Sequence, residues 1–232
     1  MEREIYSRFM TAKRNGNIVE IKKIYDSYPN DLLIKFEYAK LLRRVDVTAA
    51  KKLLKELIGT RNENFALLEL GSIERGLGNY NLSRNYFLTI INNSKSSDKD
   101  RCFATMELGK LEVIMGNKDK AREIFNSLRG TFNECYALLE IGKLELSEGN
   151  TTEAKELFKK GIGSKCGSYC LLWLGRAEAM EGNNMSALLY FNELLITPIR
   201  VHAMREIEKI KRIQLEESKE INKKIRRKEN EG

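Results

Sequence analysis

Length, composition and charge limit the kinds of protein that this chain can be. Its 232 residues are 42% hydrophobic, include only two prolines and carry a formal net charge of +8, which fits one elongated helical domain. No apolar stretch approaches the roughly 20 residues that a membrane-spanning helix needs, and the residues from Met1 to Glu4 lack a signal peptide's apolar segment. We therefore expect a cytoplasmic protein with no transmembrane segment.

The N-terminal part of the chain carries two weak copies of a pattern that becomes clear further on. Gly16-Asn17 gives a turn signal, and Pro29 ends the segment that follows it. The second copy is marked by small and apolar residues at Tyr38, Ala39, Ala50, Leu54 and Leu57. Each copy predicts a pair of helices.

Four strong copies of the pattern follow between residues 64 and 197. Each has an apolar residue and a glycine, a glutamate three residues later, a Gly-Asn pair, and a phenylalanine nine residues after the second glycine. The step is 38 residues from the first copy to the second and 33 thereafter. Such a period predicts a helical solenoid, in which each unit buries its apolar face against its neighbours. The first glycines are Gly71, Gly109, Gly142 and Gly175, and the phenylalanines are Phe87, Phe125, Phe158 and Phe191.

Each copy predicts two helices that pack closely. Apolar residues three apart, such as Leu138, Ile141 and Leu144, predict the first helix. Gly149 would end that helix, and Asn150 would cap the second. Small residues in the second helix are expected to approach the glycine of the first, at Ser83, Ala121, Ala154 and Ala187. The repeated glutamates are expected to form ion pairs within a unit, such as Glu112 with Arg122 or Glu145 with Lys155.

The longer first step places five extra residues between Asn92 and Arg101. This segment is polar, with Ser94, Ser96, Ser97 and Asp98. It leaves the repeat register unchanged on both sides. We therefore expect an exposed, mobile loop that tolerates insertion.

The C-terminal segment is the most basic part of the chain. Residues 200–232 contain eleven Lys or Arg against seven Glu, and the run from Lys223 to Lys228 is the densest part. Apolar residues at Val201, Met204, Ile207 and Ile210 predict a helix that packs on the last pair. We expect a repeat domain over 1–197 and a capping helix with a basic tail over 198–232. A solvated cap and a contact with nucleic acid or an acidic surface both fit the tail.

The pattern resembles the tetratricopeptide repeat, with its Leu-Gly pair, later Gly, Ala and Phe at matching offsets. The resemblance implies an all-α fold, a right-handed α-solenoid of about six antiparallel helix pairs plus a C-terminal helix. The repeated glutamates, at Glu74, Glu112, Glu145 and Glu178, depart from that pattern. They are similar to the half-a-tetratricopeptide variant of RNA-processing scaffolds, although that variant's strong aromatic residue is absent.

The sequence shows none of the residue groups that catalysis, metal binding or cofactor binding requires. The glycines are spaced as helix stops, and the single histidine, His202, offers little acid–base chemistry. Cys102 and Cys135 occupy one repeat position, which suggests packing. Cys166 and Cys170 could bind a metal or form a redox pair, but a zinc site needs about four ligands. We expect a non-enzymatic protein with no catalytic residues, no metal and no cofactor.

The tetratricopeptide resemblance also implies a binding surface, a concave groove lined by the first helices. Matching places give an aromatic and aliphatic stripe at Leu33, Phe36, Phe65, Leu68, Phe103, Met106, Tyr136, Leu139, Tyr169 and Leu172. A basic column lies beside it at Lys40, Lys110, Lys143 and Arg176. The alternative is that the stripe packs between units and that Glu107–Lys110 and Glu140–Lys143 are ordinary helix pairs.

These features together predict a protein-interaction scaffold. Its partner would be a helix or extended peptide with apolar anchors and acidic residues. The clamp for chaperone C-terminal carboxylates needs Lys or Asn where this chain has Leu or Met, so we do not expect that ligand. The second hypothesis is an RNA-associated scaffold of the half-a-tetratricopeptide type.

Overall fold

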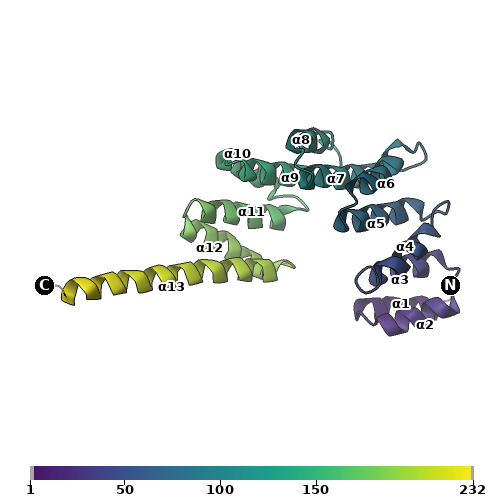
Figure 1. Cartoon of the computed structure of the whole chain (residues 1–232), viewed down its shortest axis with the longest axis horizontal. Coiled ribbons are helices and arrows are strands. Elements are labelled where there is room, and N and C mark those ends of the chain that lie inside the picture. The colour runs from purple at the N-terminus through teal and green to yellow at the C-terminus, as the bar shows by residue number, and fades with distance from the viewer. Residues whose placement is uncertain (1–2, 231–232) are drawn as a thin grey trace. The chain divides into compact units, whose positions relative to one another are not determined.

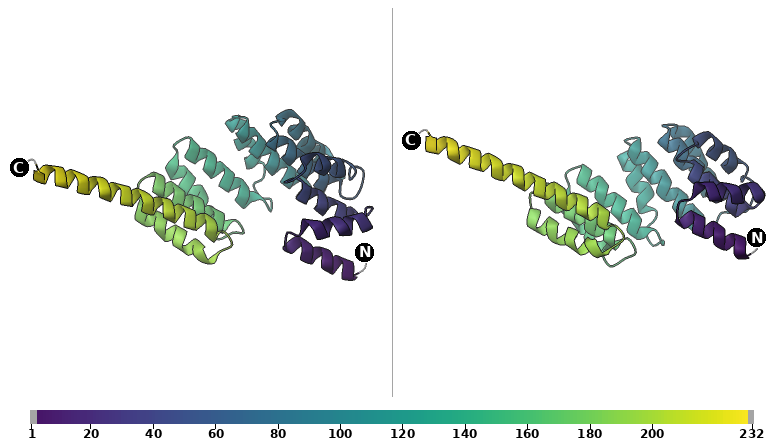
Figure 2. Two further views of the ribbon diagram at one scale, coloured as in Figure 1. Left: turned by 60° about the horizontal axis from the view of Figure 1, so that its bottom comes forward. Right: turned by 90° about the horizontal axis from the view of Figure 1, so that it is seen from below.

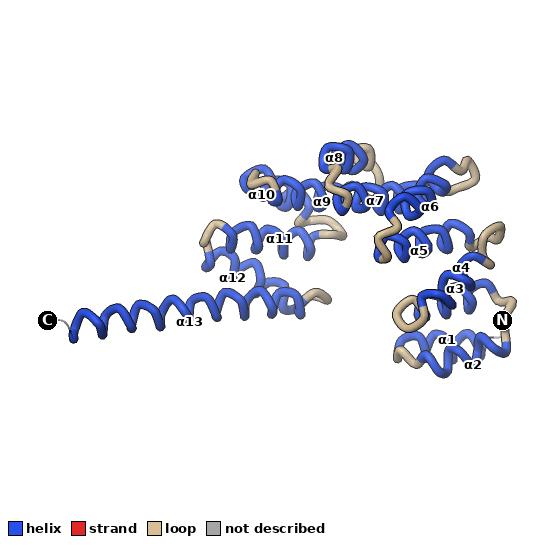
Figure 3. Tube along the Cα trace, in the orientation of Figure 1, coloured by secondary structure: helices blue, strands red, loops and turns tan. Residues whose placement is uncertain are grey.

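The structure is a computed structural model that describes residues 3–230, with side chains for residues 4–224. Helices joined by short turns make up this range, and it contains no strand (Figure 1, Figure 3). Thirteen α-helices and one 3₁₀ helix lie within it. In chain order they are α1 Arg3–Arg14, α2 Ile18–Ser27, α3 Leu32–Leu42, α4 Val47–Lys55, α5 Glu63–Gly76, α6 Tyr80–Asn92, α7 Asp98–Ile114, α8 Lys118–Asn126, α9 Glu134–Ser147, α10 Thr151–Gly161, α11 Gly167–Met180, α12 Asn184–Glu193, η1 Leu194–Ile196 and α13 Arg200–Asn230.

Two compact units divide the chain, with the boundary between Ile124 and Phe125. In the first unit α1 packs on α2, α3 on α4 and α5 on α6, and each pair contacts the next along the chain. In the second unit α9 packs on α10 and α11 on α12, and α13 lies against α11, α12 and η1. Helix α8 crosses the boundary. The helices are paired as the repeat predicts, so the fold class is confirmed.

Glycines with positive φ end the first helices as the sequence predicts. Gly78 has φ +81° and Gly149 has φ +87°, a conformation that side chains other than hydrogen rarely allow. The next residue closes the turn, since Asn150 donates its backbone N–H to the Glu145 carbonyl at 2.9 Å. These local signals place the two helices of each pair side by side.

The ring of the repeated phenylalanine fills the space that the repeated glycine leaves. A Cβ added to Gly142 would lie 2.5 Å from Cε1 of Phe158, and one added to Gly175 would lie 2.6 Å from Cε1 of Phe191. Gly71 has the same relation to the fully buried Phe87. The small residue of the second helix also approaches the glycine as expected, since Ser83 donates its hydroxyl to the Gly71 carbonyl at 2.7 Å.

Glu74, Glu112 and Glu178 each pair with a cation of the preceding helix pair, and Glu112 also pairs with Lys120 of its own helix pair. Glu112 accepts hydrogen bonds from Arg84 of α6 at 2.9 and 3.0 Å, and lies 3.2 Å from Lys120. Glu178 lies 2.9 Å from Lys155 of α10. The expected pairings of Glu112 with Arg122 and of Glu145 with Lys155 are therefore wrong. Arg84 and Lys155 directly follow the small residues Ser83 and Ala154 of their second helices. Each of these cations pairs with the glutamate in the first helix of the next repeat.

The same hydrogen bond recurs at the repeated glutamates and favours their charged form. The asparagine after each turn donates its amide to the carboxylate, at 2.8 Å for Asn117 to Glu112 and 2.9 Å for Asn183 to Glu178. Burial alone would raise the pKa of Glu112, but the hydrogen bonds from Asn117 and Arg84 outweigh it and lower that pKa. The hydrogen bond from Lys155 is the main cause of the lowered pKa of Glu178.

The insertion between α6 and α7 is only partly a loop. The helix α7 begins at Asp98 and is 17 residues long, whereas α5 and α9 each have 14. Ser97 caps it by accepting the Asp100 backbone N–H at 3.1 Å. Ser96 is buried, and its carbonyl accepts a hydrogen bond from Arg101. The expected exposed loop over 92–101 is therefore shorter, because the extra residues lengthen α7.

The start of helix α13 matches the start of the first helix of each repeat. Thr197 donates its hydroxyl to the Leu194 carbonyl at 2.7 Å, the bond that Thr131 makes to the Leu128 carbonyl before α9. Counting from these threonines, Glu208 falls at the glycine place and Lys211 at the glutamate place, and both are exposed. Charged residues thus stand where a second helix would pack. The helix continues past α11 and α12 (Figure 2).

Candidate functional site

The aromatic residues of the predicted stripe lie at the surface of the first helices. In the first unit Phe65 of α5 is 49% exposed and Phe103 of α7 is 40% exposed. In the second unit Tyr169 of α11 is 43% exposed, and Tyr136 of α9 is half-buried. We call these four residues the aromatic row.

The aliphatic members of the stripe are placed differently. Met106, Leu139 and Leu172 are buried, and Leu68 is half-buried. Leu139 and Leu172 belong to the hydrophobic core of the second unit. The aliphatic side chains of the stripe therefore pack between helices, as the alternative interpretation proposed. The exposed part of the stripe is the aromatic row.

The predicted basic column is neutralised by carboxylates. Lys110 donates to Glu107 at 2.8 Å, and Lys143 donates to Glu140 at 2.7 Å. Both lysines thus form the ordinary helix pairs that the alternative interpretation expected. Arg176 in α11 donates to Glu206 of α13 at 2.7 and 3.0 Å.

In the first unit, ion pairs also join neighbouring first helices. Arg43, the residue after α3, lies 3.1 Å from Glu69 of α5, and Arg75 of α5 lies 2.7 Å from Glu107 of α7. Burial would raise the pKa of Glu107, but Lys110 and Arg75 lower it. These ion pairs between first helices were not predicted from the sequence. The available signal was a glutamate at the same place of successive first helices, at Glu69 and Glu107.

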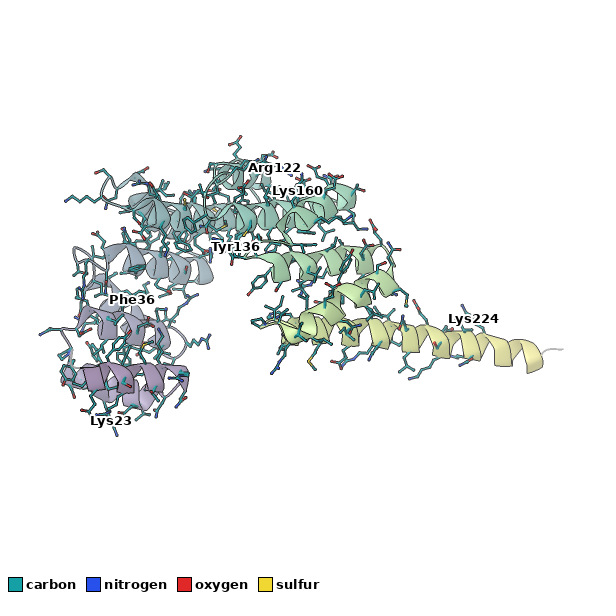
Figure 4. The ribbon with its side chains drawn as sticks, turned by 180° about the vertical axis from the view of Figure 1, so that it is seen from behind. Lys23, Phe36, Arg122, Tyr136, Lys160 and Lys224 are labelled. Atoms are coloured by element: carbon teal, nitrogen blue, oxygen red, sulfur yellow. The ribbon has the colours of Figure 1, made fainter. Side chains whose placement is uncertain are left out.

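Aromatic rings contact each other and cations along the first unit. Phe36 of α3, labelled in Figure 4, lies 5.9 Å from Phe65 between ring centroids. The Lys40 ammonium lies 5.3 Å from the Phe36 centroid. A ligand side chain on this surface would meet apolar faces bordered by paired charges.

The second unit has a richer set of cation–π contacts. Lys165 lies 4.7 Å from the Phe132 ring and 5.5 Å from that of Tyr136, which Figure 4 labels on α9. The single tryptophan, Trp173, lies between Lys143 at 5.1 Å and Arg176 at 4.6 Å. Contacts of this kind contribute about 0.5–1 kcal/mol at exposed sites.

Trp173 also lines a pocket that the sequence analysis did not find. The pocket measures about 380 Å³ and lies between α11, α12 and α13, with Trp173, Arg176, Met180, Ile210 and Ile213 in its lining. Trp173 stands where the other first helices carry Glu69, Glu107 and Glu140. The replacement of the repeated glutamate by tryptophan at this place was the feature of the sequence that could have indicated the pocket.

Metal ligands, membrane-spanning helices and cysteines were compared with the expectations from the sequence in the part of the chain that the structure describes. Among residues 4–224 no group of three or more His, Cys, Asp or Glu side chains is placed to hold a metal ion. No helix in the described range combines the length and apolar character needed to cross a bilayer. Cys102 and Cys135 are half-buried, while Cys166 and Cys170 are buried.

Solved structures resemble this chain over most of its length. PilF from Pseudomonas aeruginosa is 16% identical with a TM-score of 0.59, covering 89% of this chain and 96% of its own. PilW, a type IV pilus biogenesis factor, is 17% identical with a TM-score of 0.60, covering 84% and 94%. The C-terminal part of a TPR repeat-containing protein from Cytophaga hutchinsonii is 18% identical with a TM-score of 0.53, covering 80% and 76%.

These likenesses establish the fold. No protein-family model matches the sequence, and no curated protein matches it. The chain therefore has a TPR-like helical repeat fold. Because a fold hosts many functions, the function is argued from the surface residues.

Proposed function

We propose that the chain is a non-enzymatic scaffold that binds a protein or peptide on the face formed by its first helices. The aromatic row carries this proposal. Phe65, Phe103 and Tyr169 keep between 40% and 49% of their surface exposed, although burying an aromatic side chain is strongly favourable. Exposed aromatic rings at one repeated place are the anchors that a peptide ligand needs.

The charge pattern supports a ligand whose affinity comes mainly from apolar side chains. Lys110 and Lys143 are already paired with glutamates, so a ligand carboxylate would compete with an existing partner. Acidic ligand residues would then set orientation and association rate. In the second unit Lys165 lies against two aromatic rings, which suits an acidic residue next to an apolar anchor.

Each unit carries its own part of the binding surface that we propose. The anchors are Phe65, Phe103, Tyr136 and Tyr169, and the polar border is Lys110, Lys143 and Arg176. Three residues after each anchor lies an aliphatic residue that packs between helices and would hold the anchor's helix in place: Leu68, Met106, Leu139 and Leu172. The segment 198–232 would act as a cap, and removal of residues 216–232 should leave binding unchanged.

The test starts from a peptide selected from a random library on the immobilised wild-type chain. Phe65→Ala with Phe103→Ala, and separately Tyr136→Ala with Tyr169→Ala, should weaken its binding by about 30-fold or more, since aromatic anchors often contribute about 2 kcal/mol. The matched control is Met185→Ala with Leu189→Ala, two exposed apolar residues of a second helix. Equal binding by all three variants would contradict the proposal.

The RNA hypothesis rested on the repeated glutamates, on the Ala-Arg offset in the second helix and on the basic tail, and ion pairs between repeats account for two of the glutamates. Glu112 and Glu178 join neighbouring repeats through Arg84 and Lys155. Of the basic run 223–228, Lys223 and Lys224 are exposed, and the side chains of 225–228 lie outside the described residues. A complex with RNA would weaken steeply as salt rises from about 50 to 200 mM, whereas the peptide complex should change little.

We also propose that the protein works in the cytoplasm. The four cysteines, all within the described range, are free thiols, which fits a reducing compartment. Detection of the tagged chain in cell fractions would test this.

A further inference from the structure

The same turn joins a second helix to the next first helix at four places in the chain. Its hydroxyl residue donates to the carbonyl three residues earlier. The donors are Thr60, Thr131, Ser164 and Thr197, and the acceptors are Leu57, Leu128, Gly161 and Leu194. Three of these acceptors are buried leucines. The shared turn therefore identifies Gly161 as the residue that stands in the leucine's place.

Two sulfur atoms lie where a leucine side chain lies at the other junctions. Cys166 and Cys170 are fully buried, with their Sγ atoms 3.4 Å apart. A Cβ on Gly161 would collide with the Cys170 sulfur and lie 3.5 Å from the Cys166 sulfur. At the other three junctions the place of Cys170 is taken by buried alanines, Ala66, Ala137 and Ala203.

The shape of the junction does not require thiols. Leucine with alanine fills the same space three times in this chain. At the fourth junction the leucine is absent, and two cysteines converge on the space it leaves. At this junction Gly161 takes the place of the leucine and Cys170 takes the place of the alanine, while Cys166 supplies a second sulfur. The junction therefore differs from the other three in its chemistry.

The surroundings of the pair favour reaction at Cys170. The Cys166 thiol shares a hydrogen bond with Cys170, which lowers the pKa of Cys170 and raises that of Cys166. The Ser164 hydroxyl lies 3.2 Å from the Cys166 sulfur. Residues 162–165, directly before the pair, are exposed, so a small reagent has a short path to it.

We propose that Cys166 and Cys170 form a modification site, a dithiol that a peroxide oxidises reversibly to a disulfide. The Cys170 thiolate attacks one oxygen of the peroxide, the O–O bond breaks, and the sulfur becomes a sulfenic acid while the other oxygen leaves as water or an alcohol. The Cys166 sulfur then attacks the sulfenic sulfur. The S–S bond forms, and the hydroxyl leaves as water with the Cys166 proton. Two thiols are oxidised and one peroxide is reduced.

A reductant restores the pair. Exchange with a small thiol opens the disulfide through a mixed disulfide, and a second thiol releases the protein. Neither cysteine belongs to the aromatic row, although Tyr136 packs against the cluster that holds both and Tyr169 directly precedes Cys170.

Peptide mapping tests the proposal directly, because trypsin cuts after Lys165 and Arg176 and releases both cysteines in one peptide. The folded full chain is treated with hydrogen peroxide, then alkylated in denaturant and digested. The peptide 166–176 should lose both alkyl labels together and become about 2 Da lighter than the unlabelled dithiol. Dithiothreitol should restore both labels.

The chain supplies its own controls. Cys102 appears in a separate single-thiol peptide, 102–110, and should keep its label at the dose that closes the pair. Cys135, in the peptide 130–143, packs against the cluster that holds the pair, so it should keep its label only if the disulfide joins Cys166 to Cys170. In Cys166→Ser the remaining Cys170 should be oxidised to sulfenic or sulfinic acid without a disulfide. The proposal is overturned if 166–176 keeps both labels after Cys102 and Cys135 have reacted. Equally fast closure in urea would also overturn it, because the folded junction would then have no part in the reaction.

Discussion

The two compact units depart from the repeat in different ways. The first unit departs in length, with a 38-residue step whose extra residues partly extend α7, which has 17 residues where α5 has 14. The second unit keeps a step of 33 residues but departs in chemistry, at Gly161, Cys166, Cys170 and Trp173. The inserted residues are accommodated because Ser97 caps α7 and lets that helix begin about one turn earlier. The larger side chain of Cys170 is accommodated because its neighbour Gly161 has no Cβ.

The largest expected effect tests whether both units depend on the same internal packing. Phe87→Ala in the first unit and Phe158→Ala in the second should each cost about 3–5 kcal/mol, because each leaves a cavity beside a glycine. Urea unfolding followed by circular dichroism measures the loss. The fluorescence of Trp173, whose ring centroid lies 6.4 Å from that of Phe158, should respond more strongly to Phe158→Ala. Wild-type stability in both variants would refute the repeat register.

A smaller effect is expected where the second unit departs from the repeat. Gly161→Leu restores the residue found at the other junctions, but it would meet the Cys170 sulfur and should cost about 1–3 kcal/mol. Adding Cys170→Ala and Cys166→Asn, the residues at the Leu57 and Leu128 junctions, should recover most of that stability. A cycle of thermal melts measures the coupling. Additive losses would show that the sulfurs do not occupy the leucine's space.

Acid should weaken both units through the buried glutamates. Hydrogen bonds and cations lower the folded-state pKa values of Glu74, Glu112 and Glu178. Their stabilisation is therefore complete above the unfolded pKa of about 4.3, and falls as the pH drops through the lower folded values. Thermal melts from pH 7 to 3 should show this decline below about pH 5.

Substitution of one glutamate separates this effect from general acid denaturation. Glu112→Gln should cost about 1–3 kcal/mol at pH 7, since it leaves Arg84 and Lys120 without their carboxylate, and should flatten the acid decline. Glu178 is less buried than Glu112, so Glu178→Gln should cost less. An acid decline of wild-type steepness in Glu112→Gln would contradict this role.

The smallest effect is expected at the paired lysines. Lys110→Glu in the first unit and Lys143→Glu in the second should each change stability by less than about 1 kcal/mol, because these pairs are partly solvated. Lys143→Glu should also shift the emission of Trp173, whose ring the ammonium covers. Lys110→Glu is the control without that shift. Equal emission spectra would show that the contact does not persist in solution.

The sequence by itself determined the elements and their pairing. Glycine ends a helix through its own backbone freedom, as at Gly78 and Gly149, and asparagine or aspartate begins one, as Asp31 does by accepting the Leu33 and Ile34 N–H groups. The apolar spacing fixed which faces are buried, including that of Phe158. These signals act over a few residues, so they can be read from the order of residues alone.

Only the tertiary structure decided which side chains meet across repeats. The ion pair of Glu112 with Arg84 joins residues 28 positions apart, and Arg176 meets Glu206 across 30. The burial of Met106 and exposure of Phe103, three residues apart on α7, likewise depend on how adjacent helices cross. A repeat offers each charge several partners at similar sequence distances. Packing selects one of them, because only that partner comes within bonding distance in the folded chain.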